Sequence, residues 1–360
     1  MIMTTKKIVP AFVLLIILCG CINGNKNLNT EIEMVEPEIY AKYLTMIPGA
    51  GEKPDLYYSD EAMLGLKLSR FVQNRWETTY LDQLDTQEHF NPVMGKHFLL
   101  HGKIFYLDYQ SENRIVLKQL TEKEEGGFLA DGTRISCSDF YVLQDSSESE
   151  PLLFYYDSGV LKAALLEEQR YIKELEFDTG KFRDVEEFQV FKTLDYYTMV
   201  YSGSGGLFLV RLALNRNEKK LEVESLLQID SGIEQFHAVL FDDDVTILYY
   251  SREYLLSCYR GGTTQKIGYY PEINFLNVNY HKNQPVFTVC TPDKESKNQP
   301  VYAVYFIHGD SPANKKWRED LLVRSDTPFI ACSTLDTDDN FYMLLSGNIL
   351  QLLTISASGL

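Results

Sequence analysis

A strand–turn–strand unit recurs along this chain at nearly constant spacing. Six times, two runs of strand-forming residues flank a short turn, and the turn centres fall near residues 112, 158, 204, 252, 297 and 347. A period in the forties with short strands throughout indicates a β-propeller, in which each repeat forms one blade. The paired runs are 104–109 with 114–120, 152–156 with 160–165, 196–201 with 207–214, 245–250 with 254–259, 285–290 with 301–307, and 341–345 with 349–355.

The composition agrees with an all-β chain that buries a substantial core. Apolar residues make up 45% of the sequence, and 24 Tyr and 20 Phe stand against 2 Trp. Aromatic side chains pack well on a pleated sheet. We therefore predict an all-β, six-bladed β-propeller over residues 56–360, with seven blades as the alternative count. Residues 221–227 are expected to form an outer strand, and residues 76–81 are expected to pair with 349–355 and close the ring.

The first residues of the chain have the layout of an export signal. Lys6 and Lys7 precede an apolar run over 8–18, which is too short to span a ~30 Å hydrocarbon core. The run ends in Leu18-Cys19-Gly20-Cys21, which resembles the bacterial lipobox. The resemblance implies a signal peptide over 1–20, cleavage before Cys21, and a diacylglycerol on the Cys21 thiol. An uncleaved N-terminal anchor is the alternative.

The lipobox resemblance also predicts where the protein works. Two acyl chains would hold it on the outer side of the cell membrane, whereas a single chain binds only marginally. The Asn-rich stretch after Cys21 is typical of a flexible tether. We expect this tether to occupy residues 21–55, with a short helix over 31–42 that ends at 48–51.

The repeat itself resembles the six-bladed propellers of the TolB-like superfamily, which occur in many exported bacterial proteins. The resemblance covers about residues 60–360 and rests on the period and the strand pattern. It implies a ring with a central channel and a loop-lined face where partners usually bind. The hairpin turns are therefore candidate partner-binding loops, and they include Gln110, Asn113, Asp157, Ser204, Arg252 and Asn348.

Cysteine and histidine do not form a recognisable site in the sequence. Cys137, Cys258, Cys290 and Cys332 lie far apart, without a C-x-x-C motif, and we expect buried free thiols, with disulfides as the alternative. His97 and His101 are four residues apart, but they flank a predicted strand and lack an H-E-x-x-H frame. No metal site or cofactor is predicted.

Two acidic clusters and one glycine-rich segment are best explained as turns. The run 336–340 begins like a calcium loop, but Phe341 stands where the loop needs glycine and Gly347 where it needs glutamate. The run 241–244 also suits a turn between strands. Residues 202–206 lack the Gly-Lys-Ser/Thr ending of a P-loop and the G-x-S-x-G of a nucleophile elbow.

The charge balance limits the class of partner. Lys and Arg number 34 against 51 Asp and Glu, for a net charge of −17, which would repel nucleic acid.

We expect a monomeric, membrane-tethered binding or scaffold module for a protein, peptide or cell-wall partner. The alternatives are a glycan hydrolase or lyase with carboxylates in the channel, and an accessory or sensor subunit of a transport or signalling system. Adjacent tyrosines such as 155–156 could also bind carbohydrate, but they suit blade packing better.

Overall fold

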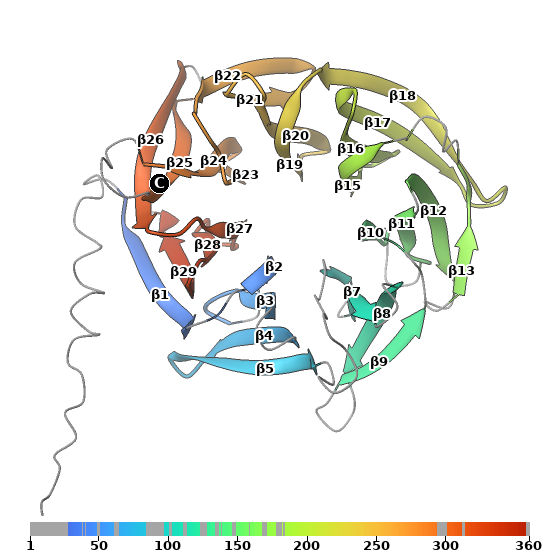
Figure 1. Cartoon of the computed structure of the whole chain (residues 1–360), viewed down its shortest axis with the longest axis horizontal. Coiled ribbons are helices and arrows are strands. Elements are labelled where there is room, and N and C mark those ends of the chain that lie inside the picture. The colour runs from blue at the N-terminus through green and yellow to red at the C-terminus, as the bar shows by residue number, and fades with distance from the viewer. Residues whose placement is uncertain are drawn as a thin grey trace, which may run out of the picture.

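In the computed structural model, the described residues lie within 28–357, and their strands are arranged in a ring (Figure 1). Residues 1–27 and 358–360 lie outside the described part, as do 38, 40, 49–50, 61–64, 84–96, 101–102, 111–113, 123–127, 134–136, 138, 146–148, 158, 168–170, 178–181, 183, 294–300 and 312–313. No helix in the described part is long and apolar enough to cross a membrane.

The described strands form seven sheets, and each sheet is one blade in which the four main strands are antiparallel. Blade 1 comprises β2 (Ala41–Ile47), β3 (Asp55–Asp60), β4 (Gly65–Val72) and β5 (Arg75–Gln83); blade 2 comprises β6 (His97–Leu100), β7 (Lys103–Gln110), β8 (Arg114–Glu122) and β9 (Phe128–Thr133). Blade 3 comprises β10 (Asp139–Leu143), β11 (Leu152–Asp157), β12 (Val160–Glu167) and β13 (Tyr171–Glu174). Blade 4 comprises β15 (Val185–Lys192), β16 (Tyr197–Gly203), β17 (Gly206–Asn215) and β18 (Lys220–Asp230), with β14 (Glu176–Phe177) added in parallel to β18.

The remaining three blades complete the ring. Blade 5 comprises β19 (Ile233–Phe241), β20 (Asp244–Ser251), β21 (Leu255–Arg260) and β22 (Thr263–Tyr269); blade 6 comprises β23 (Phe275–His281), β24 (Gln284–Pro292), β25 (Tyr302–Ser311) and β26 (Asn314–Ser325). Blade 7 comprises β27 (Ile330–Leu335), β28 (Phe341–Ser346), β29 (Ile349–Ile355) and β1 (Thr30–Pro37). Figure 1 shows β2, β10, β15, β19, β23 and β27, each the first strand of its four-strand repeat, next to the axis. The strand β6 has the same place in the order of its sheet.

The predicted all-β propeller fold is confirmed. The described residues form seven sheets, which matches the alternative prediction of seven blades. All six expected strand pairs are present, as β7–β8, β11–β12, β16–β17, β20–β21, β24–β25 and β28–β29. The seventh pair is β3–β4, near the segment assigned to the tether. The outer strand expected at 221–227 lies within β18.

The strand that closes the ring was wrongly predicted. Residues 76–81 belong to β5 and pair with β4 inside blade 1, through a tight turn at Gln73-Asn74. Both turn residues have positive φ, 50° and 63°, as a two-residue type I′ hairpin requires. The edge of β29 is covered instead by β1, from Thr30 opposite Ile355 to Pro37 opposite Ile349.

The helix expected over 31–42 is also wrong, because this segment supplies β1 and the start of β2. Charged and apolar residues alternate over 31–34, which favours a strand with one half-buried face. Ile32 packs against the core between blades 6 and 7, and Val35 against the core between blades 7 and 1. The propeller therefore begins at β1, well before residue 56.

Large apolar side chains fill the spaces between neighbouring blades. Phe154, Phe188 and Met199 belong to one such cluster between blades 3 and 4, and each is essentially inaccessible to solvent. Many of the Tyr and Phe residues that are abundant in the sequence lie in these cores. The largest fully buried side chains include Tyr58, Tyr249, Tyr250, Phe287 and Phe306. This packing fixes the seven inner strands around the axis.

Candidate functional site: the axial channel

A cavity of about 660 Å³ lies on the axis of the ring and is lined by all seven inner strands. Each blade contributes at least one side chain to it. One lining residue from each strand in order is Tyr43, Phe98, Tyr141, Glu187, His237, Asn277 and Cys332. Because these positions are far apart in sequence and meet only when the ring closes, the cavity is a property of the whole propeller.

Aromatic rings line the channel on three consecutive blades. Tyr43 comes from β2, Phe98 from β6 and Tyr141 from β10. The rings of Phe98 and Tyr141 have centroids 4.5 Å apart and are inclined at 57°, so they pack as one surface. Burial raises the pKa of Tyr141 to about 12, so its hydroxyl remains protonated at neutral pH. This sector therefore lines the channel with uncharged aromatic rings.

Tyr43 is held in an uncommon backbone conformation. Its φ is 51°, in the left-handed region that bulky residues rarely occupy. The pairing of β2 with β3 is irregular here, between Lys42 and Thr45, which marks a β-bulge. The Tyr43 side chain is 38% exposed although it sits on an inner strand. Bulges often redirect a side chain next to a binding site.

Polar groups occupy another sector, on β19, β23 and β27. The Val278 amide donates to Nδ1 of His237 (3.3 Å), so this nitrogen accepts and Nε2 carries the proton. Nε2 lies 3.4 Å from the Asn277 side-chain amide, and Ser333 Oγ lies 2.7 Å from its other end. Ser333 Oγ donates to Asn277 Oδ1, so the side chains of His237, Asn277 and Ser333 form one contact network across the three inner strands.

His237 carries no charge at neutral pH in this arrangement. Burial lowers the pKa of its imidazole to about 4, because the charged form would lose its hydration. Among the described residues that line the cavity there is no Lys or Arg, and Glu187 on β15 is the sole carboxylate. The described lining of the channel therefore combines aromatic rings from three blades, one carboxylate and a neutral group of hydrogen-bonded side chains.

A carboxylate pair does not line the described part of the channel. Glycoside hydrolysis needs two carboxyl groups roughly 5 to 10 Å apart, one on each side of the scissile bond. Glu187 has no second carboxylate beside it among the residues that line this cavity. The lining combines aromatic and aliphatic walls with a few polar groups.

The candidate partner-binding loops lie at the turns between the second and third strands of their blades. Ser204, Arg252 and Asn348 are exposed in these turns, which share one face of the ring because every blade has the same strand order. Asp157 ends β11 and accepts from Lys162 (2.9 Å), and Gln110 ends β7. Asn113 and the expected loop 294–298 lie outside the described residues. Their role in partner binding stays a prediction.

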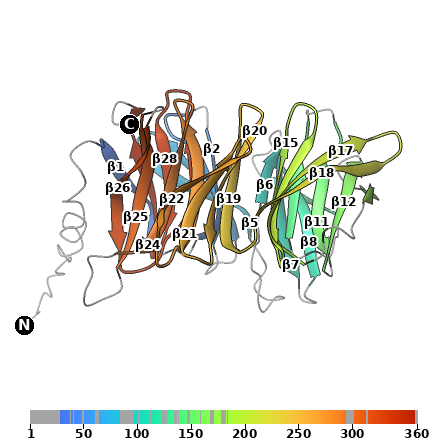
Figure 2. The same cartoon turned by 90° about the horizontal axis from the view of Figure 1, so that it is seen from above.

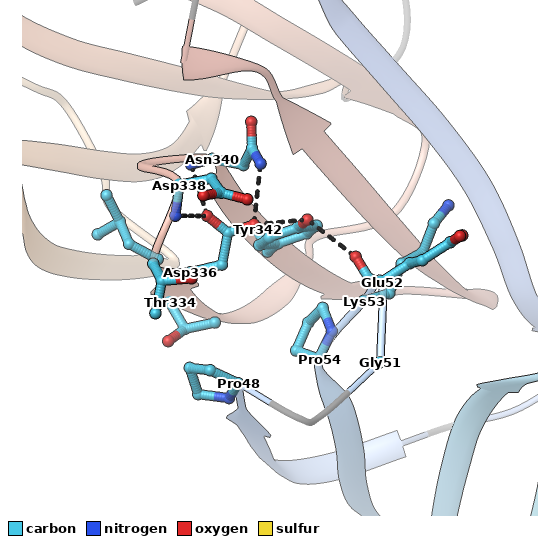
Figure 3. A pocket seen from close by; sticks show the side chains of 12 residues that line it. Pro48, Gly51, Glu52, Lys53, Pro54, Thr334, Asp336, Asp338, Asn340 and Tyr342 are labelled. Atoms are coloured by element: carbon cyan, nitrogen blue, oxygen red, sulfur yellow. Dashed lines mark hydrogen bonds between the residues drawn. The ribbon is translucent and has the colours of Figure 1, made fainter.

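The run 336–340 forms the turn between β27 and β28, and it borders a second cavity of about 300 Å³ (Figure 3). Asp336 accepts from the backbone amides of Asp338 and Asn340 (2.9 Å each) and from the Tyr342 hydroxyl (3.0 Å). Burial would raise the pKa of Asp336, but these hydrogen bonds outweigh it and lower the pKa. The carboxylate thus stabilises its own turn, as expected for a turn rather than a calcium loop.

The other two segments predicted as turns are confirmed. Asp242 and Asp243 form a two-residue turn with positive φ between β19 and β20. Residues 202–206 join β16 to β17. Gly206 has φ 119°, and a Cβ there would lie 2.0 Å from the Asp230 carbonyl oxygen, so this position requires glycine.

The four cysteines after the N-terminal segment are free thiols, as expected. Cys137, Cys258 and Cys290 are buried, and burial raises the pKa of the first two to about 12 and of the third to about 11. Cys332 is half-buried and borders the channel. His97 lies in β6, and His101 and Cys21 lie outside the described residues.

Sequence reasoning did not single out the channel residues. Tyr43 lay in the expected tether, and His237 and Asn277 lie in inner strands 40 residues apart. His237 interrupts the apolar run Phe236–Phe241 of β19, and this is the sequence feature that could have marked it as a channel residue. Their proximity depends on which strand of each blade lies innermost, and the hairpin period does not encode that.

Solved structures with the same architecture are numerous, but their sequence identity is low. No protein-family model and no curated protein matches the chain. A streptogramin B lyase structure is 11% identical with a TM-score of 0.56, covering 92% of this chain and 100% of that chain. BBS1N in complex with ARL6DN is 13% identical with a TM-score of 0.54, covering 91% and 96%.

A puromycin hydrolase structure is 11% identical with a TM-score of 0.53, and the match covers 89% of this chain and 52% of that chain. At these identities the likeness shows the β-propeller fold alone, because one fold supports many unrelated activities. The TolB-like resemblance stays a prediction.

Proposed function

We propose that this protein is a membrane-anchored binding propeller, working outside the cytoplasm, whose axial channel receives a group of a peptide or cell-wall partner or a small solute. The channel carries this proposal: seven inner strands enclose about 660 Å³ with an aromatic wall, a neutral polar relay and one carboxylate. Pockets with mostly apolar walls and a few placed polar groups are typical ligand sites. The single carboxylate in the described lining favours binding over glycan hydrolysis.

A blocked channel tests the binding proposal. Thr45 lies in the channel wall on β2, and Thr79 lies exposed on β5, the outer strand of the same blade. We expect at least one of N-acetylglucosamine, alanyl-alanine, putrescine and choline to raise the melting temperature of the wild type. Thr45→Trp should lose that shift because the indole fills the channel, whereas Thr79→Trp should keep it.

Three results would contradict the proposal. One is an equal shift in both variants, which would place binding outside the channel. Another is the absence of any shift at millimolar concentrations of all four compounds. The third is consumption of a compound by the wild type at a rate that Thr45→Trp abolishes, which would make the channel an active site.

The membrane attachment is a separate part of the proposal and rests on Leu18-Cys19-Gly20-Cys21 after an apolar run. Cys21→Ser removes the thiol that would carry the diacylglycerol. We expect this variant to be absent from the acylated membrane fraction when cells are labelled with a fatty acid, whereas Cys19→Ser should be labelled normally. Labelling of the Cys21→Ser protein at the wild-type level would show that the lipobox interpretation is wrong.

A further inference from the structure

We infer that the axial channel binds an organic ammonium ion with alkyl groups on its nitrogen. The inference rests on the proposed function, because it places the ligand in the channel, and it adds the chemical class. Three features carry it: an aromatic wall contributed by three consecutive blades, one carboxylate on the next blade, and an imidazole that stays neutral.

The aromatic wall suits a cation. Tyr43, Phe98 and Tyr141 project from the inner strands of blades 1, 2 and 3, and Phe98 and Tyr141 are in ring contact. The face of an aromatic ring carries negative charge density, and several faces around one point attract quaternary ammonium groups in particular. Tyr43 reaches this wall through a bulge and a positive φ. Backbone strain of this kind clusters at ligand sites.

The charges around the wall point the same way. Glu187 comes from blade 4, directly after the three aromatic blades, and it supplies a negative charge to the described lining. Glu187 is solvent-exposed on the inner strand β15 and lines the channel. His237 would repel a cation if it were protonated, but the low pKa of its buried imidazole prevents this at neutral pH. The net charge of −17 adds a long-range attraction for cations.

An alkylated nitrogen suits this lining better than a metal ion or a primary amine. Ca²⁺ and Mg²⁺ take six or more oxygen ligands and Zn²⁺ takes three or four Cys, His or carboxylate ligands, but the described residues contain no cluster of three or more such side chains. A primary ammonium has three protons that each need an acceptor. Leu44, Ile47 and Leu276 also line the cavity and offer contacts to methyl groups, whereas the side-chain oxygens of Gln189 and Asn277 already accept hydrogen bonds from Ala238 and Ser333.

A pair of isosteric compounds tests the inference directly. Choline and 3,3-dimethylbutan-1-ol have nearly the same shape, but only choline is charged. We expect isothermal titration of the full-length protein in a non-ionic detergent to show at least tenfold tighter binding of choline. Equal affinities would overturn the ammonium inference and leave the channel as a site for neutral ligands. Failure of both compounds to bind would also overturn it.

Matched variants locate the binding. Glu187→Gln should weaken choline binding at least tenfold, whereas Glu186→Gln, one residue away, exposed and outside the channel lining, should leave it unchanged. Tyr141→Leu should weaken it and Tyr141→Phe should retain it, because the ring and not the hydroxyl makes the contact. Equal effects of Glu187→Gln and Glu186→Gln would overturn the inference.

The two proposals fail separately. If a neutral compound raises the melting temperature of the wild type but not of Thr45→Trp, and choline does not bind, the channel remains a binding site while the ammonium inference fails. If choline binds the wild type and Thr45→Trp equally well, the proposed site itself is wrong.

Discussion

Deletion of residues 2–38 is expected to abolish the cooperative thermal unfolding of the propeller. This deletion removes β1, the fourth strand of blade 7, and uncovers the whole edge of β29. It also removes Ile32 and Val35 from the two cores that flank this blade. An uncovered, apolar strand edge leaves backbone groups unpaired and promotes aggregation. Because a ring loses contacts on both sides when one blade fails, the effect should spread beyond blade 7.

The control for this deletion is a shorter one. Removal of residues 2–27 deletes the N-terminal segment that precedes the described residues but keeps all of β1. Circular dichroism during heating should show one sharp transition for the shorter deletion and none, or aggregation, for the longer one. A sharp transition at an unchanged temperature in both proteins would show that β1 does not close the ring.

Lys67→Met is expected to cause a large loss of stability at the junction of blades 7 and 1. The Lys67 amine lies 2.7 Å from Asp60 Oδ2 and 2.6 Å from Glu36 Oε1, and the Lys67 and Asp60 side chains are 5% and 2% exposed. Burial alone would lower the pKa of Lys67, but hydrogen bonds and charges from these carboxylates outweigh it and raise the pKa. Removing the amine leaves the buried Asp60 carboxylate without its cation.

The expected cost follows from that buried charge. Loss of one partner of a buried ion pair costs about 3 to 5 kcal/mol. For a chain of this size that corresponds to a fall in Tm of roughly 4 to 7 °C. Calorimetry of Lys67→Met should show this fall, and the double variant Lys67→Met/Asp60→Asn should recover much of it. A single variant as stable as the wild type would show that the ion pair is not desolvated.

The same cluster links the closing strand to the next blade. Glu36 of β1 accepts from Lys67 and, through Oε2, from the Tyr58 hydroxyl at 2.7 Å. The Tyr58 hydroxyl is also 2.7 Å from Ser69 Oγ. Ring closure therefore uses two kinds of contact: the β1–β29 ladder within blade 7 and a charged network across the boundary to blade 1 (Figure 2 shows the blades edge-on).

The strand pairs of the fold could be predicted because each one is local. A run such as 245–250, a short turn and a second run at 254–259 contain within about fifteen residues all that a hairpin needs. Ring closure could not be predicted in the same way. The strand pair β1–β29 joins residues more than 300 positions apart, and several strand-like segments, residues 76–81 among them, have the composition to fill that place.

The seventh blade was missed for a related reason. Its central hairpin, β3–β4, begins at Asp55, where the polar N-terminal region was expected to end. Residues 31–42 contain Glu and Lys, which favour helices in isolation, but the uncovered edge of β29 outweighs that preference. Local propensity therefore gave the wrong structure at the place where a long-range contact decides it.

The channel depends on the same long-range information. The sequences of the strands that carry Tyr141, Glu187 and His237 do not mark these residues as part of a site. They come to line one cavity because the ring closes. The bulge that directs Tyr43 into the channel is a backbone irregularity without a sequence signature here. The sequence does not predict where in the ring a ligand would lie.

A crystal structure of the protein with choline tests the central claim most directly. The account predicts density for the ligand on the axis of the ring, with its trimethylammonium group against the Phe98 and Tyr141 rings and within about 6 Å of their centroids, on the side of Glu187. Density at the hairpin turns that carry Ser204, Arg252 and Asn348, with the channel free of ligand, would contradict the account.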